Sequence, residues 1–423
     1  MYHDNLNNIY FDYYTLKVSY IFNQMEVFCV LILVLIILIL LKIIKLNREE
    51  MNNYYNFNST ALIGGNRFFN ASDAAYDEVQ NIRSEEAQVK EYIKKICNAT
   101  DDTQVIFTSG ATESMATILN WVKSYNQYGT VYGSRFDHNS IILNCKNQNL
   151  KYDVLNYKNM IDNNVHELPP DISCLFLTHV SPHTGEIIPV EKLMNKLDFT
   201  FLNDIDDYNE DGVEVVGQYK PLVVLDASQS IGKTNIDMKK WGLNAVFFSL
   251  HKLGGKMNCG VLLIRDSIEM PFKPLIAGKQ QNAMRGGTYD VYSYLNFEEL
   301  YNTYTESVDH QQCKKTWKKA YKAFRKAGLD VYEPKYNHLY NTILIRTKVC
   351  SYNMIKELSQ YGIYVSGKTA CDSLDKSDKE SNIRISFING DISNKTINKI
   401  VEVINKWENN EELLELEDES DSE

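Results

Sequence analysis

From Val105 onward, the chain alternates short apolar runs with amphipathic stretches. Six of the runs are apolar at almost every position, which is typical of strands in a sheet that helices cover on both faces. These predicted strands are 105–110, 130–136, 174–180, 222–228, 245–250 and 260–266. Segments with helical spacing, such as 114–125, lie between several of them. The alternation predicts an α/β fold with a mainly parallel sheet.

Beyond about residue 300 the pattern changes. Amphipathic helical patterns occupy 316–328, 353–362 and 396–407. Isolated strand-like runs lie between them, at 341–347, 363–367 and 382–387. This mixture predicts a smaller α+β domain. We therefore expect an N-terminal arm over 51–65, a large domain over 66–298 and a small domain over 299–407.

The N-terminal part contains fifteen consecutive apolar residues, 27–41. Extended through Lys42 and Lys45 to Leu46, the run is long enough to span a bilayer if both lysines reach the interface. A buried helix would need a polar face, and a cleaved signal peptide a preceding basic segment. The run therefore predicts a single-pass transmembrane anchor at 27–46, after a tail over 1–26.

Positive charge follows the run, at Lys42, Lys45 and Arg48, and it predicts a cytosolic position for the globular part. Translation from Met1 or Met25 would keep the run, whereas translation from Met51 would omit it. The sequence does not decide between these three translation starts.

Charge and cysteine content exclude several classes of function. The net charge is −11, and residues 408–423 carry nine acidic side chains and no basic one, which predicts an acidic disordered tail. The basic residues are not clustered enough to indicate a nucleic-acid partner. The eight cysteines are irregularly spaced, which argues against a metal site or a disulfide framework and suits a reducing compartment.

Polar residues follow the predicted strands where each strand ends. The strand at 245–250 leads into His251 and Lys252, and a lysine there loses hydration unless it reaches water or a partner. A turn of small hydroxyl residues and glycine, 108–114, enters a helix and suits an anion such as phosphate. Such residues lie together at the carboxyl edge of a parallel sheet. Pyridoxal phosphate (PLP) has the phosphate, ring nitrogen and aldehyde that this set could bind.

The segment 222–265 resembles the cofactor segment of class V, fold-type I PLP enzymes, and is closest to that of the cysteine desulfurases. Further desulfurase-like motifs follow the family order at 107–114, 278–288, 365–371 and 383–387. The resemblance implies a seven-stranded, mainly parallel sheet in a homodimeric enzyme. It also implies L-cysteine as substrate, L-alanine as product and a possible sulfur-acceptor protein.

The resemblance assigns the ring and the chemistry to a first group of residues. Lys252 would form the Schiff base, Asp226 would pair with the pyridinium nitrogen and Gln229 would bond the ring hydroxyl. His138 would stack on the ring and act in catalysis. Cys371 would be the catalytic thiolate that takes up sulfur as a persulfide.

A second group would bind the phosphate and the substrate. The phosphate ligands would be Ala111, Thr112, Ser249 and His251, with Thr288 supplied by the neighbouring subunit. Arg384 would bind the substrate carboxylate, a bidentate task that suits a guanidinium.

The chain departs from the family pattern at several positions. Pro182 stands where an amide side chain is usual, and no histidine follows Asn70-Ala71-Ser72. Two alternatives therefore stay open. One is a class V PLP enzyme of other specificity, such as a selenocysteine lyase or an aminotransferase, and the other is a non-catalytic PLP-fold protein.

Overall fold

The structure is a computed structural model, and it describes residues 32–42, 77–134, 137–163, 168–197, 205–208, 214–217, 220–265, 271–367, 381–387 and 390–409. The chain divides into two compact units, Met1–Phe68 and Phe69–Glu423, and each is described by itself.

In the first unit, residues 32–42 form a helix whose apolar side chains are all exposed, from 43% for Ile32 to 60% for Leu33. Within the described residues, no helix has both the length and the apolar character needed to span a membrane. The predicted anchor at 27–46 extends past both ends of this helix, and it stays a prediction.

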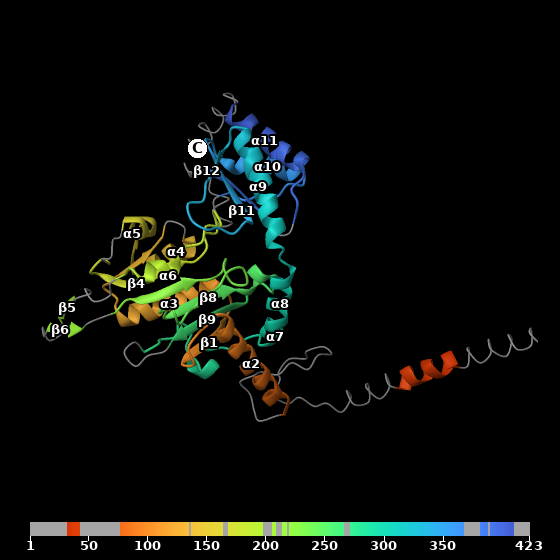
Figure 1. Cartoon of the computed structure of the whole chain (residues 1–423). Helices are drawn as coiled ribbons and strands as arrows, with labels where there is room; N and C mark the ends of the chain where they lie inside the picture. Colours follow the sequence, from red (N-terminus) through yellow and green to blue (C-terminus); the bar gives the residue numbers. More distant parts are fainter. Residues whose placement is uncertain are drawn as a thin grey trace, which may run out of the picture. The chain divides into compact units, whose positions relative to one another are not determined.

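The second unit is built on a seven-stranded sheet with the strand order β1-β9-β8-β7-β4-β2-β3 (Figure 1). Its strands are β1 (Thr103–Thr108), β2 (Thr130–Gly133), β3 (Lys151–Val154), β4 (Ile172–Thr178), β7 (Leu222–Asp226), β8 (Ala245–Ser249) and β9 (Gly260–Arg265). Six of these strands run in one direction, and β9 runs antiparallel to both of its neighbours, β1 and β8. The mainly parallel seven-stranded sheet that the resemblance implied is confirmed.

Helices cover both faces of this sheet (Figure 1). One face packs against α3 (Ala111–Tyr125) and α4 (Asn139–Asn147). The other packs against α2 (Asp77–Ile96), α5 (Tyr157–Asn163), α6 (Val190–Met194), α7 (Tyr292–Leu295) and α8 (Phe297–Ser307). Because both faces are covered, the central strands are buried throughout, which explains their unbroken apolar sequences.

A second core lies around a three-stranded antiparallel sheet, β10 (Asp330–Val331), β11 (Thr342–Thr347) and β12 (Ser381–Ser386). The helices α9 (His310–Lys326), α10 (Ser351–Gln360) and α11 (Asn394–Glu408) pack against it. The α+β character predicted beyond residue 300 is confirmed, whereas the boundaries between the predicted domains stay predictions.

Several details differ from the prediction. The exposed edge strand β3 and the small hairpin of β5 (Ile205–Tyr208) and β6 (Glu214–Gly217) were not predicted. The strand predicted at 363–367 is wrong, because this segment pairs with β12 only through an isolated bridge between Ser366 and Arg384. The predicted arm at 51–65 lies outside the described residues, as does nearly all of the acidic tail.

Candidate cofactor and active site

The carboxyl ends of the parallel strands bring the predicted polar residues to one edge of the large sheet. Thr108 ends β1, Asp226 ends β7 and Ser249 ends β8. His138 follows β2 and is the N-cap residue of α4. Because ligands of such sheets bind outside these ends, this edge is the candidate site.

Asp226 supplies a buried carboxylate at the centre of this edge, with 8% of its surface exposed. Burial raises the pKa of its carboxyl group, while bonding from Ser228 and the nearby His138 and Lys252 oppose the rise. The amide of Ser228 donates to Oδ1 at 2.8 Å. The structure therefore brings the predicted carboxylate, imidazole and amine into one electrostatic cluster.

The ring of His138 is oriented by its own helix cap. Its Nδ1 accepts from the amide of Ser140 at 3.2 Å. Since an amide can only donate, the neutral ring carries its proton on Nε2. The preceding Asp137 is buried and accepts from the hydroxyls of Ser134 at 2.7 Å and Thr178 at 2.6 Å. These bonds fix the loop that carries His138.

The N-terminus of α3 faces the same edge. The amide of Ala111 donates to the hydroxyl of Ser249 at 3.0 Å, so two predicted phosphate ligands lie in contact. Thr112 follows and is exposed. A Cβ at Gly260 would lie 2.5 Å from the carbonyl carbon of Gly110, so glycine is required where β9 passes this turn. Helix amides and hydroxyls together suit a phosphate.

Lys252 lies half-buried in the short 3₁₀ helix η1 (Leu250–Leu253), beside the exposed His251. A second lysine, Lys233, lies near it and was not predicted. Burial and the charge of Lys252 lower the pKa of Lys233 to about 8. Its amine lies 5.7 Å from the centre of the Tyr304 ring. The only sequence signal for Lys233 was its place inside the 222–265 segment.

Arg384 comes to the site from β12, where its Nη1 donates to the carbonyl of Pro182 at 3.1 Å. Its Nε is buried and has no hydrogen-bond partner in the described part of the chain. Burial lowers the pKa of the guanidinium. Pro182 thus contributes its carbonyl group, and the guanidinium keeps a donor for a carboxylate.

For three predicted residues the structure gives less information. Gln229 is half-buried three residues after Asp226, and Thr288 is exposed on the loop before α7. Cys371 lies outside the described residues.

A cavity of about 470 Å³ adjoins this edge, beyond the carboxyl ends of β2 to β4. Its lining includes Ser134, Thr178 and Ser181, which follow β2 and β4, and Lys335 and Tyr336, which precede β11. None of the residues predicted to bind the cofactor lines it. The cavity is therefore a neighbour of the candidate site and not the site itself.

Comparison with known proteins decides the family. The model of the family "Aminotransferase class-V" matches residues 65–204 and 209–395. The chain belongs to this family. Class V enzymes and the related cysteine desulfurases use PLP, so the predicted cofactor is confirmed.

Individual relatives are more distant. Proteins named cysteine desulfurase IscS from Buchnera aphidicola and Haemophilus influenzae are 26% identical to this class V chain over 211 and 219 residues. These matches cover 48% and 49% of the chain and the same shares of the relatives, so the chain matches about half of their length.

Solved structures show the fold. A NifS-like protein has a TM-score of 0.62 at 21% identity, over 80% of this chain and 90% of its own. A NifS-like protein from Rickettsia africae has a TM-score of 0.61 at 19% identity, over 80% and 91% of the two chains.

The residues at the sheet edge fit PLP. A buried carboxylate is the partner that a pyridinium nitrogen requires, and Asp226 provides it. Lys252 provides an amine whose charge acts on Asp226, and the first turn of α3, which includes Thr112, provides the helix N-terminus that a phosphate prefers. The donor set of this class V site thus matches the nitrogen, the aldehyde and the phosphate.

Proposed function

We propose that this class V enzyme is a cysteine desulfurase, which removes sulfur from L-cysteine, leaves L-alanine and carries the sulfur as a persulfide on Cys371. The observation that carries the proposal is the half-buried Arg384, whose Nε lacks a partner in the described structure and whose Nη1 bonds Pro182. Pro182 lies on the loop after β4, and His179 at the start of that loop donates to the carbonyl of Asp226 at the end of β7. An amino acid brings the carboxylate that such an arginine binds. The names of the relatives support cysteine as the amino acid.

Each side chain then has a defined task. When bound, PLP supplies an electron sink that lets the Cα of an amino acid lose a proton. Lys252 would accept this proton at its amine, and Asp226 would keep the ring nitrogen protonated. Arg384 would hold the substrate carboxylate, while His138 would stack on the cofactor ring. Cys371 would attack the substrate sulfur as a thiolate.

The reaction balances without an outside oxidant. The bond between Cβ and sulfur of the substrate breaks, and Cβ gains a proton. The sulfur atom joins the thiol of Cys371 as a persulfide. One cysteine and one enzyme thiol thus become one alanine and one enzyme persulfide, from which an acceptor protein could take the sulfur.

The test uses the full-length protein loaded with PLP and supplied with L-cysteine and a reductant. We expect alanine and sulfide in equal amounts. Cys371→Ser should retain the yellow absorption of the bound cofactor and lose alanine formation, whereas Cys350→Ser, the control at a half-buried cysteine, should keep both. Alanine formation by Cys371→Ser at the wild-type rate would indicate a lyase. No alanine from the wild type would contradict the proposal.

We also propose a homodimer and a membrane anchor. Thr288, exposed on its loop, would reach the phosphate in the neighbouring subunit. Residues 27–46 would anchor the enzyme in a membrane with its catalytic part in the cytosol. The support is a helix over 32–42 with only apolar side chains before Lys42, followed by basic residues.

A further inference from the structure

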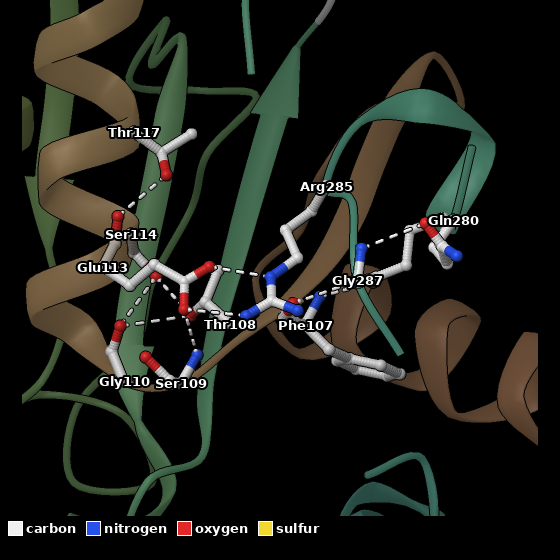
Figure 2. Close-up of polar contacts among 12 residues, drawn as sticks. Phe107, Thr108, Ser109, Gly110, Glu113, Ser114, Thr117, Gln280, Arg285 and Gly287 are labelled. Carbon is white, nitrogen blue, oxygen red and sulfur yellow. Dashed lines mark hydrogen bonds and ion pairs between the residues drawn. The ribbon is translucent and has the colours of Figure 1, made fainter. Parts of the chain in front are cut away.

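A half-buried ion pair joins the first turn of α3 to the loop that carries Thr288 (Figure 2). The carboxylate of Glu113 accepts from Nε of Arg285 at 2.9 Å and from Nη2 at 3.2 Å. It also accepts from the amide of Ser109 at 2.7 Å. The two side chains are only 9% and 16% exposed. Glu113 thus binds one amide of the turn directly and binds the loop through Arg285.

The same loop is fastened at a second point. The side-chain amide of Gln281 pairs with the backbone of Phe107, accepting from its nitrogen at 2.7 Å and donating to its oxygen at 2.8 Å. Gln280 accepts from the amide of Gly287 at 3.0 Å, one residue before Thr288 (Figure 2). The loop is therefore attached both to the end of β1 and to the start of α3.

The charge of Glu113 is unfavourable for the phosphate that this turn would hold. A carboxylate in the first helical turn lies within a few residues of Ala111 and Thr112, and two anions that close together repel each other. Arg285 lies on the carboxylate and cancels its charge. Bonding from Arg285 and Ser109 lowers the pKa of Glu113, against the effect of burial, so the carboxylate stays ionised.

We propose that Glu113 and Arg285 are a positioning pair for the cofactor phosphate. The pair holds the Ser109–Ala111 turn and the Thr288 loop in register, and Arg285 removes the repulsion that Glu113 would exert on the phosphate. The inference concerns cofactor binding and does not depend on sulfur being the product.

The experiment compares PLP with pyridoxal, which has the same ring and aldehyde but no phosphate. The dissociation constants of both are measured on full-length protein freed of cofactor, from the absorbance of the bound form. Arg285→Met should weaken PLP binding about tenfold or more, since the half-buried carboxylate of Glu113 loses its partner and then repels the phosphate, and should leave pyridoxal binding unchanged. The double variant Glu113→Gln/Arg285→Met should regain the part of the PLP affinity that repulsion by the unpaired Glu113 removed.

Arg265→Met is the matched control, because Arg265 pairs with Asp102 at the opposite edge of the same sheet and both are exposed. It should change neither constant. Equal losses of PLP and pyridoxal affinity in Arg285→Met would overturn the proposal, as would a double variant no better than the single one. If Arg285→Met fails to fold, Glu113→Gln decides. It should keep or improve PLP affinity, because the amide oxygen of glutamine can still accept from Ser109 and Arg285 and so hold the turn and the loop, while the negative charge is gone. A selective loss of PLP affinity would contradict the proposal.

Discussion

The amine of Lys252 stands among charges of both signs. Asp226 faces it from β7, and Lys233 approaches it from the turn after that strand. The turn packs closely, since a Cβ on Gly232 would lie 2.8 Å from Leu253, the residue after Lys252. Two neighbouring cations favour loss of a proton from one of them, and an amine needs its neutral form to act as a nucleophile.

We expect borohydride to fix the cofactor on Lys252 when the loaded protein is reduced. Peptide mass spectrometry should find the label on Lys252 and not on Lys233 or Lys256. Lys252→Ala should lose the yellow absorption, and Lys256→Met should keep it, because Lys256 is exposed and pairs with Asp290 at the surface. A label on Lys233 would show that the catalytic amine is the other lysine of this cluster.

A second residue-scale prediction concerns acid stability. His179 is buried against Trp241, and burial lowers its pKa from 6.5 to about 4. The unfolded chain therefore binds a proton that the folded chain refuses, and stability is lost as the pH falls from 6.5 toward 4. The loss from this group is about 3 kcal/mol at most. His179→Phe should flatten the fall in the free energy of unfolding, measured with denaturant.

Asp137 provides a control of opposite sign. Burial raises its pKa from 3.8 to about 6, so its contribution to stability is present below 3.8 and is lost as the pH rises through 6. Asp137→Asn should therefore make the free energy of unfolding fall more steeply as the pH is lowered. If the free energy of unfolding of His179→Phe falls with pH as steeply as that of the wild type, the prediction is contradicted, because His179 then takes up its proton in the folded chain as readily as in the unfolded chain.

At the scale of elements, strands buried on both faces could be predicted from the sequence, while exposed or long-range features could not. β4, β7 and β8 are buried at every residue and are apolar runs. β3 is mostly exposed and has no such pattern. Glu113 and Arg285 lie 172 residues apart, and no local periodicity signals their pairing.

The strand ends explain why much of the candidate site could be predicted. Parallel strands place their carboxyl ends together whatever their order, so Asp226, His138 and Ser249 had to meet at one edge. Lys233 was missed because a lysine in a turn is ordinarily solvated, and only the packing of the turn shows its burial.

The loop before α7 gives the element-scale prediction. A Cβ on Gly286 would lie 2.1 Å from the carbonyl oxygen of Ala277, a clash between backbone segments. Gly286→Ala should therefore lower the free energy of unfolding by about 3 kcal/mol or displace the loop. Gly328→Ala is the control, because no atom of the described structure lies within 4 Å of a Cβ there, and its φ of +86° costs only about 1 kcal/mol of backbone strain. Equal losses of unfolding free energy in the two variants would show that the loop moves to accommodate the Cβ added at Gly286.

At the scale of the whole second unit, Glu186 joins the large sheet to the segment that leads into β11. Its carboxylate is buried and accepts from the amides of Lys335 and Tyr336 and from the hydroxyl of Tyr332, each at 2.8 Å. The neighbouring Ile187 donates to the carbonyl of Asn337 at 2.7 Å. This junction keeps the three-stranded sheet, and with it Arg384, against the loop after β4.

The anchor gives the last prediction, which concerns the full-length chain. A run of only apolar side chains over 32–41 is costly to expose to water, and a bilayer would remove that cost. We expect full-length protein to stay with membranes after carbonate washing. Its acidic C-terminus should be open to protease on the cytosolic side, because Lys42, Lys45 and Arg48 follow the run.

The double variant Leu35→Lys/Leu38→Lys should be released from the membrane, since each lysine near the centre of a span costs about 3 kcal/mol. Leu143→Lys, a matched change at an exposed leucine of α4, should leave the distribution unchanged. Wild-type protein washed off by carbonate, or a C-terminus protected from protease, would contradict the anchor and leave the PLP site unaffected.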